Sequence, residues 1–231
     1  DIERLLAERA DCERRGQEVA VPYRVPASAF RQYVTAPEQV AERLRRPMPQ
    51  RPYRQTRLGT VFHRWVEQRY GLGAVPDRLD AALSAALDGA LTRDDAGEGV
   101  DAGALQTLQE RFAASEWGTR EPIEVECEIH LPLAGHLIIC KLDAVYPARI
   151  PRTDGRFVDG VEVVDWKTGK APTTNDERAE KVLQLALYRL AYARRTGRPL
   201  DEISVALYFV ADDLVLRPEH LPGEAELVAL W

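Results

Sequence analysis

The sequence predicts an α/β domain in which a central mixed sheet is flanked by helices and preceded by a helical N-terminal region. Apolar residues follow a helical period up to about residue 120 and then alternate with a period of two. From there the order is three strands, one long apolar helix and another strand, which is typical of such a sheet. With 231 residues, 45% of them hydrophobic, the chain can bury a sizeable core.

The net charge, the cysteines and the lengths of the apolar runs argue against several classes of protein. The formal net charge of −6 gives no support for bulk attraction to nucleic acid. Cys12, Cys127 and Cys140 form no CxxC pair, which favours a reducing compartment and argues against a zinc or iron–sulfur site. No apolar run reaches about 18 residues, so no membrane-spanning helix is expected. The only methionine is Met48, and we therefore expect a piece of a longer protein.

The N-terminal region is expected to combine short helices with extended segments. Residues 1–16 resemble a polar helix, and residues 21–26 an extended segment. Ser28 is a good N-cap for a short helix, and Pro37 fits the first turn of another. Three prolines between residues 47 and 52 exclude regular helix and central strand there.

A more apolar helix is predicted from about Leu58 to Tyr70. Helices near 78–92 and 102–115 are expected around a loop at 94–103 that is rich in Gly and Asp. The apolar face of the first helix is formed by Leu58, Val61, Phe62, Trp65 and Val66.

Strands are expected after residue 122. Alternation over residues 123–130 predicts a strand with one buried face, and the Ala134-Gly135 turn joins it to a hairpin partner at 136–146. A loop rich in Pro, Asp and Gly is expected at 147–160. The remaining elements are a strand at 161–167, a largely buried helix at 176–196 and strands at 203–210 and 213–217.

Asp165 and Lys167 lie two residues apart near the end of a predicted strand. Because a strand sends alternate side chains to one face, the two project together, with Val161 and Val163 behind them. A carboxylate and an ammonium at the end of a buried strand are costly unless they pair or serve a site. An isolated Asp-x-Lys is usually a surface ion pair, but a Thr168-Gly169 turn follows and lets the backbone open toward a ligand.

Asp143 adds a second carboxylate at the matching position of the preceding strand. Two carboxylates and one lysine can hold a hard divalent cation beside a polarised water, which suggests metal-assisted phosphodiester hydrolysis. His63 is a possible third ligand, although a lone histidine on a mostly apolar helix is more often a core residue.

Other polar residues allow two interpretations each. Glu124, Glu126 and Glu128 are expected to share one strand face, either solvated or with one carboxylate held by a metal or an arginine. Gln184 and Tyr188 lie one helical turn apart. One interpretation is that they contact the site or a DNA strand, and the other is that they form a buried amide–phenol hydrogen bond.

A basic segment precedes and enters the helix that carries His63. It could follow a phosphate backbone, with Tyr33 and Tyr53 as stacking surfaces, or it could be a solvated face. It has no acidic residue and seven arginines, at positions 43, 45, 46, 51, 54, 57 and 64.

Five motifs in this order resemble the RecB family of PD-(D/E)xK nucleases, which implies a restriction-endonuclease-like core. They extend over about 130 residues, so the match is specific. The motifs are Gly59-Thr60-Val61-Phe62-His63, Val125-Glu126, Leu142-Asp143, Val164-Asp165-Trp166-Lys167-Thr168-Gly169 and Gln184-Leu185-Ala186-Leu187-Tyr188.

The resemblance implies a role for each matching residue. His63, Asp143 and Asp165 would bind Mg²⁺ or Mn²⁺ together with the backbone carbonyl of Trp166. Lys167 would orient or deprotonate the attacking water and offset charge on the phosphorane. Catalysis would thus depend on Asp143, Asp165, Lys167 and Glu126, with Glu126 binding or supporting the metal. Substrate would be positioned by Gln184, Tyr188, Arg57, Arg64 and Thr168.

The lead-in from Val25 to Pro47 resembles that of nuclease domains at the C-terminus of AdnAB-type and UvrD/RecB-like actinobacterial helicase-nucleases. This implies a DNA nuclease of the bacterial cytoplasm that acts on single strands in double-strand-break processing and recombinational repair. Its partners would be a helicase motor upstream in the same chain and a second helicase-nuclease subunit, with no membrane. Residues 1–231 would form one domain: a lead-in (1–57), the part with the histidine (58–120), the catalytic sheet and buried helix (121–217) and a tail (218–231).

One departure and one alternative accompany the resemblance. Cys140-Lys141 stands where the family usually has Gly-Arg, which affects fine geometry more than the ligands. The alternative is a catalytically silent DNA-binding or docking module of a helicase complex. Such modules typically lose a ligand or the lysine, whereas His63, Asp143, Asp165 and Lys167 are all present, which favours activity.

Overall fold

The computed structural model describes residues 2–4, 19–45, 54–71, 101–152 and 154–231. The helix expected at 78–92 and the proline-rich stretch at 47–52 lie outside these ranges. So does most of the helix expected at 1–16.

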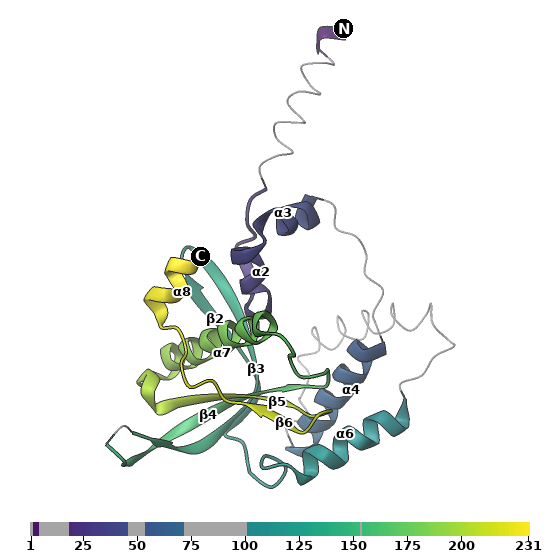
Figure 1. The fold of residues 1–231 in the computed structure, drawn as a ribbon, viewed down its shortest axis with the longest axis vertical. Helices are drawn as coiled ribbons and strands as arrows, with labels where there is room; N and C mark the ends of the chain where they lie inside the picture. The colour runs from purple at the N-terminus through teal and green to yellow at the C-terminus, as the bar shows by residue number, and fades with distance from the viewer. Residues whose placement is uncertain (1, 5–18, 46–53, 72–100, 153) are drawn as a thin grey trace.

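In the part of the chain that the structure describes, six strands form one mixed sheet, as the sequence predicts (Figure 1). The order is β1-β3-β4-β5-β6, and β2 pairs with β3 off this path. The β1–β3 and β4–β5 pairs are parallel, whereas β2–β3, β3–β4 and β5–β6 are antiparallel. The strands are β1 (Arg24–Pro26), β2 (Glu124–Leu133), β3 (His136–Pro151), β4 (Phe157–Lys167), β5 (Ile203–Phe209) and β6 (Leu214–Leu216).

The helices begin at recognisable sequence signals in some places and not in others. Pro37 begins α3, as expected. Ser28 is not an N-cap, because it lies inside the 3-10 turn η1 (Ala27–Ala29), and the helix that follows has Ala29 at its N-cap. The helices are α2 (Phe30–Thr35), α3 (Pro37–Arg45), α4 (Arg54–Arg69), α6 (Ala102–Ala114), α7 (Asn175–Thr196) and α8 (Glu224–Leu230), and a second 3-10 turn is η2 (Leu200–Glu202).

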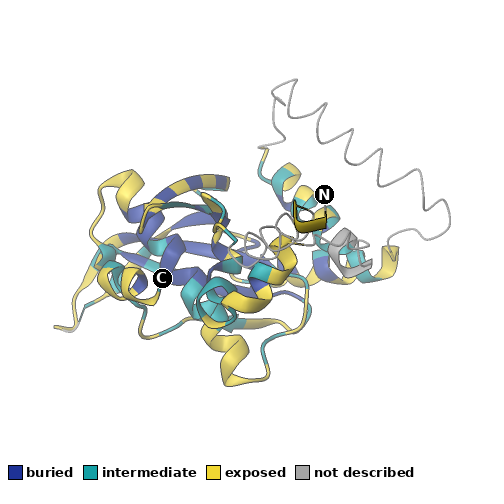
Figure 2. Cartoon of the chain, turned by 90° about the horizontal axis from the view of Figure 1, so that it is seen from above, coloured by how far each residue is buried: buried dark blue, intermediate teal, exposed yellow. Residues whose placement is uncertain are grey.

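Helices cover the two faces of the sheet and create two cores. Helix α7 lies along one face, where Leu185 and Tyr192 pack on Val163 of β4 (Figure 1). Helices α4 and α6 cover part of the other face, where Phe62 and Phe112 pack in the cluster that contains Trp166. Strands and α7 are therefore buried through the middle of the molecule, as Figure 2 shows. In the described residues, no helix is long and apolar enough to cross a membrane.

The β3–β4 hairpin extends further than the sequence predicts. Residues 147–160 were expected to form a loop, but the pairing continues to Pro151 opposite Phe157. Strand β2 pairs with β3 only as far as Val145. Beyond that point one edge of β3 has no partner strand in the described chain, so Pro147 is tolerated because its missing N–H can face the free edge.

One edge of β3 has a gap that positions the candidate site. Strand β1 pairs with this edge up to Ile139, and β4 pairs with it from Ala144 onward. Both must lie on the same edge, because β2 pairs with the other edge alongside each of them. Since β1 is parallel and β4 antiparallel to β3, they approach each other along β3 and leave residues 140–143 between them. Within the described residues no strand pairs with this stretch of the edge.

Candidate active site

Asp165 and Lys167 form an ion pair near the end of β4, on the face covered by α7. Nζ of Lys167 lies 2.5 Å from Oδ2 of Asp165. Val161 and Val163, further back on the same face, are buried in the core under α7. The prediction that the two charged side chains share a face is confirmed. Asp165 is only 2% exposed, so this is not the surface ion pair that an isolated Asp-x-Lys usually forms.

Asp143 lies where β3 and β4 separate. The ladder between the two strands ends at Ala144 opposite Val164. Just beyond it, the backbone N–H of Trp166 donates a 2.6 Å hydrogen bond to Oδ2 of Asp143. The carboxylate therefore satisfies a backbone donor where the ladder has ended, which the buried setting requires. Burial and the neighbouring charge of Asp165 raise the pKa of Asp143 above that of an ordinary carboxyl.

His63 brings a ring nitrogen from α4 to two carboxylates of the sheet. Its Nδ1 lies 3.4 Å from Oε1 of Glu126 and 3.5 Å from Oδ1 of Asp143. Each of the three residues offers a ligand atom, and these atoms lie within 4.8 Å of one another. One nitrogen and two carboxylates form a ligand set that suits a divalent cation. Asp165 is outside this group, because its carboxylate faces Lys167.

Glu126 reaches this group through an unusual backbone conformation. Its φ of 49° lies in the left-handed region, where a non-glycine residue is strained. The residue breaks the alternation of β2: Val125 packs in the core under α4 and α6, yet Cys127 is buried under α7. The prediction that Glu124, Glu126 and Glu128 share one face is therefore wrong.

The three glutamates have different environments as a result. Glu124 forms an ion pair with Arg195 of α7, whereas Glu126 contacts His63 of α4. Glu128 is bound by Lys141 and His130 on the exposed surface. Ile123, expected on the buried face, is 52% exposed.

The electrostatics of the site keep its two cations charged in the absence of metal. Burial disfavours the charged ring of His63, but the hydrogen bond that its ring donates to Glu126 and the charges of Asp143 and Glu126 outweigh it and raise the pKa to about 9. Burial likewise opposes the charge on Lys167, and Asp165 and Asp143 reverse the balance, so the pKa of the lysine is raised. The positive charges of His63 and Lys167 therefore offset the negative charge of the carboxylates near neutral pH.

Glu67 is a neighbouring carboxylate that the sequence analysis did not single out. It lies one helical turn after His63 on α4. Burial and the charge of Glu126 raise its pKa. The spacing of four residues from His63 was the available signal, since it places both side chains on one face of the helix.

Gln184 and Tyr188 of α7 contact both the site and each other. Nε2 of Gln184 lies 2.7 Å from the Tyr188 hydroxyl and 3.4 Å from Oδ1 of Asp165. Both side chains are at most 4% exposed. The pair thus forms a buried amide–phenol hydrogen bond and also contacts the site, so both interpretations apply.

The N-terminal half of α4 packs against the turn that follows β4. A Cβ on Gly59 would lie 3.1 Å from Oγ1 of Thr168, so a larger residue there would require the threonine side chain to shift by a few tenths of an ångström. Arg64 is exposed on α4. Arg57 belongs to the same helix, but its side chain lies outside the described residues.

Most of the basic segment lies outside the described residues. This applies to Arg46, Arg51 and Tyr53, and to the side chain of Arg54. Tyr33, expected as a stacking surface for a base, stacks on Trp231 with ring centroids 5.8 Å apart.

Cys140 and Lys141 occupy opposite faces of β3. Cys140 is fully buried, with its sulfur 3.8 Å from the carbonyl oxygen of Leu187 in α7. Lys141 is exposed on the other face. The cysteine side chain is therefore packed in the core beneath α7.

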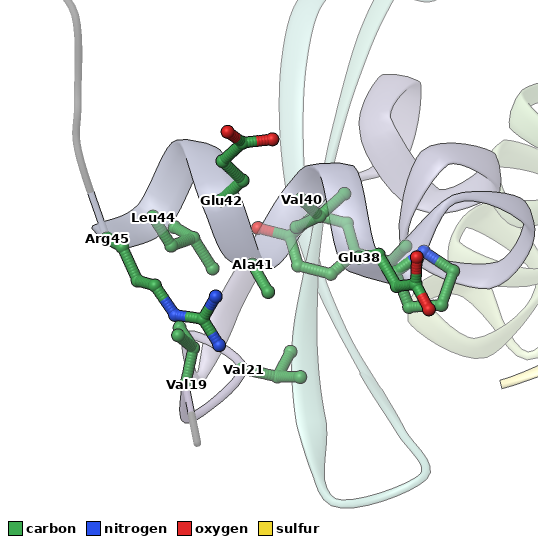
Figure 3. Close-up of a pocket in the computed structure, with 10 residues that line it drawn as sticks. Val19, Val21, Glu38, Val40, Ala41, Glu42, Leu44 and Arg45 are labelled. Atoms are coloured by element: carbon green, nitrogen blue, oxygen red, sulfur yellow. The ribbon is translucent and has the colours of Figure 1, made fainter. Parts of the chain in front are cut away.

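One hollow on the surface is not part of this site. It has a volume of about 650 Å³ and lies at α3, with Val40, Ala41 and Leu44 among its lining residues and Glu38 and Glu42 beside them (Figure 3). None of the residues expected to act in catalysis lines it.

Comparison with known proteins identifies the family. The sequence profile of the PD-(D/E)XK nuclease superfamily matches residues 26–227, and the chain therefore belongs to this superfamily. No curated protein matches the chain. The mixed sheet flanked by helices is the restriction-endonuclease-like fold of the superfamily, and nucleases of this superfamily use divalent metal ions.

Two solved structures are similar to the chain. The crystal structure of a "Putative exonuclease" from Eubacterium rectale superposes with a TM-score of 0.54 at 10% identity, and the match covers 90% of this chain and 75% of the other. At this identity the likeness shows the fold alone. The crystal structure of a protein named SSO0001 matches over 100% of this chain and 83% of that chain at 14% identity, with a TM-score of only 0.35.

The residues at the gap fit a divalent metal. Oδ2 of Asp165 is buried and has no well-aligned hydrogen bond within the described chain, although the Lys167 ammonium is close to it. The group of His63, Glu126 and Asp143 adds three further ligand atoms nearby. Buried carboxylate oxygens that lack donors are stabilised by a cation.

Proposed function

We propose that this chain is a RecB-type nuclease that hydrolyses phosphodiester bonds of single-stranded DNA with Mg²⁺ or Mn²⁺. The observation that carries the proposal is the convergence of His63, Asp143, Asp165 and Lys167 at the gap beside β3, with Glu126 in contact with the histidine. Membership of the PD-(D/E)XK superfamily supports the reaction class, and the five sequence motifs support the RecB assignment.

In this proposal the metal is held by His63, Asp143 and Asp165 with the carbonyl of Trp166, and Glu126 binds or supports it. When bound, the metal supplies a lowered pKa for water and neutralises negative charge that develops on the phosphate. Asp143 is held in place by the Trp166 N–H, and its geometry is therefore set by the sheet itself.

Lys167 acts as a fixed positive charge in this proposal. Because Asp165 and Asp143 raise its pKa, the ammonium remains protonated near neutral pH. It therefore orients the attacking water and offsets the charge of the phosphorane, rather than removing a proton from the water. Gln184 holds the Asp165 carboxylate and Tyr188 together from the side of α7.

Substrate contacts are assigned to residues around this centre. Thr168 lies in the turn after β4, beside Gly59 of α4, and Arg57 and Arg64 belong to α4, the helix that carries His63. Arginines on this helix suit a phosphate backbone.

The proposal extends to the setting of the domain. The lead-in and the motif order support a single nuclease domain over residues 1–231 with the parts given above, joined to a helicase motor in a larger bacterial cytoplasmic protein. Its partner would be a second helicase-nuclease subunit, and its role the processing of broken DNA ends for recombinational repair.

Cleavage of labelled single-stranded DNA with Mg²⁺ or Mn²⁺ tests the function. Wild type should cut, Lys167→Met should not, and Lys181→Met is the matched control, since Lys181 pairs with Glu180 on α7. If Lys167→Met cuts as well as wild type, the site is misassigned. If wild type does not cut, calorimetry with Mn²⁺ separates a competent site without substrate delivery from a silent docking module, which need not bind metal.

A further inference from the structure

A second hollow opens at the gap in the sheet, directly beside the candidate site. Its volume is about 390 Å³, within the range of small-molecule pockets, ~300–1,000 Å³. It is lined by Arg24, Pro26 and Ser28 from the β1 side and by Glu128, Ile139 and Lys141 from β2 and β3.

The strand residues of this hollow lie on the face of the sheet away from α7. Arg24 and Pro26 are exposed, while Val25 between them is buried under α7. Lys141 is likewise exposed between Cys140 and Leu142, which are buried under α7. Tyr188 belongs to α7, yet it also lines the hollow. Its side chain therefore reaches the hollow at the gap between β1 and β4, where no strand of the described residues intervenes.

The hollow lies two strand residues away from the candidate metal ligands. Lys141 precedes Asp143 by two residues on β3, and Glu128 follows Glu126 by two residues on β2. Two residues of a strand span about 7 Å. This is on the order of one nucleotide step along an extended strand. Tyr188 connects the hollow, which it lines, with the candidate active site. Its hydroxyl lies 2.7 Å from Nε2 of Gln184, which also contacts Asp165.

The charge of the hollow suits a phosphate. The Arg24 guanidinium has no ion pair or side-chain hydrogen bond within the described residues, and it lines the same hollow as Lys141. Among the described lining residues Glu128 is the only acidic one, and it already lies 3.4 Å from Lys141 and 2.7 Å from His130. On a chain with a net charge of −6, two cations beside the site provide a local attraction for phosphate that the whole molecule lacks.

We propose that this hollow is a nucleotide subsite that holds the nucleotide next to the scissile phosphate on the same strand. Arg24 and Lys141 bind the neighbouring phosphate, and Tyr188 forms the wall shared with the active site. The inference rests on the proposed nuclease function and names the part of the substrate that the site uses for positioning.

Replacing single phosphates by neutral methylphosphonates in a labelled single-stranded oligonucleotide tests the subsite. For wild type, neutralising the phosphate next to the cleaved one should lower kcat/KM about tenfold, the value of one charge-assisted contact. Arg24→Ala and Lys141→Met should each show a similar loss on the unmodified strand. In the double variant the methylphosphonate should cause no further loss. Arg149→Ala is the control, because Arg149 is exposed near the far end of the β3–β4 hairpin.

Binding measured with Ca²⁺, by fluorescence anisotropy at several salt concentrations, provides a second readout that needs no cleavage. Each lost phosphate contact should reduce the slope of log Kd against log salt by ~0.7 for a single strand. If wild type cuts and Lys167→Met does not, but both readouts are unchanged in the double variant, the subsite is wrong and the nuclease stands. If wild type fails to cut and also binds no Mn²⁺ in calorimetry, the nuclease proposal fails, and an unchanged salt slope would overturn the subsite as well.

Discussion

The backbone N–H of Trp166 donates a 2.6 Å hydrogen bond to Oδ2 of Asp143 at the point where β3 and β4 separate. The main-chain ladder between the two strands ends at Ala144, the residue after Asp143 on β3. The side-chain carboxylate of Asp143 thus continues the contact between the strands beyond the ladder. This arrangement fixes one oxygen of Asp143 and leaves the other, Oδ1, directed to His63. A ligand held by the sheet requires little reorganisation when a cation binds.

Asp143→Asn should stabilise the metal-free protein. Burial and Asp165 raise the pKa of Asp143 above its unfolded value, so the folded state binds this proton more tightly. As the pH rises above the unfolded pKa, the unfolded chain releases this proton while the folded chain retains it, and the free energy of unfolding therefore falls. Asparagine keeps an oxygen for the Trp166 N–H without the charge. We expect a gain of about 1 kcal/mol and a Tm rise of ~2–4 °C by thermal unfolding in chelator. A lower Tm would contradict this interpretation.

Glu126→Gly should raise the stability of the metal-free protein while weakening metal binding. Glycine adopts a φ of 49° without strain, whereas a left-handed non-glycine residue costs about 1–2 kcal/mol. The substitution also removes a carboxylate from the group with His63. Urea denaturation and Mn²⁺ calorimetry measure the two effects. Unchanged Mn²⁺ affinity would mean that Glu126 only supports the histidine.

Metal affinity should rise with pH and be accompanied by proton release. His63, with a pKa of about 9, is protonated at neutral pH in the absence of metal, and a metal requires the neutral ring. Mn²⁺ affinity should therefore increase between about pH 6.5 and 8 by up to tenfold per unit for each proton released. Calorimetry in two buffers of different ionisation heat counts the protons. An affinity independent of pH would show that His63 is not a ligand.

Gly59→Ala should reduce activity through the turn after β4. The added Cβ would lie 3.1 Å from Oγ1 of Thr168, and the turn that begins there directly follows Lys167. The better helix propensity of alanine, about 1 kcal/mol, compensates in stability. We expect a severalfold loss of kcat at nearly unchanged Tm. Because the contact is with Oγ1, Thr168→Ala should restore part of the lost activity in the double variant, which a general folding defect would not show.

Several parts of this arrangement could be predicted from the sequence because they depend on local periodicity. The period of two places Asp165 and Lys167 on one face, and the glycine turn at 135 brings the strand of Asp143 beside that of Val125. The spacing of four residues on α7 likewise brings Gln184 to Tyr188.

Other parts depend on tertiary structure and could not be predicted in this way. The left-handed conformation of Glu126 overrides the alternation that would have placed it beside Glu124. Pro147 suggested the end of a strand, yet β3 continues there, since no strand of the described residues pairs with that edge and needs the missing N–H. The gap at residues 140–143 results from two strands distant in sequence, β1 and β4, which share one edge of β3. No local pattern encodes such a gap.

The central claim is a divalent metal bound at the gap beside β3. An anomalous difference map from crystals soaked in Mn²⁺ tests it most directly, because manganese scatters anomalously and protein atoms other than sulfur hardly do. We predict a peak within about 2.5 Å of a His63 ring nitrogen and an Asp143 oxygen, lost in Asp143→Asn. A peak elsewhere, or none at a concentration that supports cleavage, would contradict it.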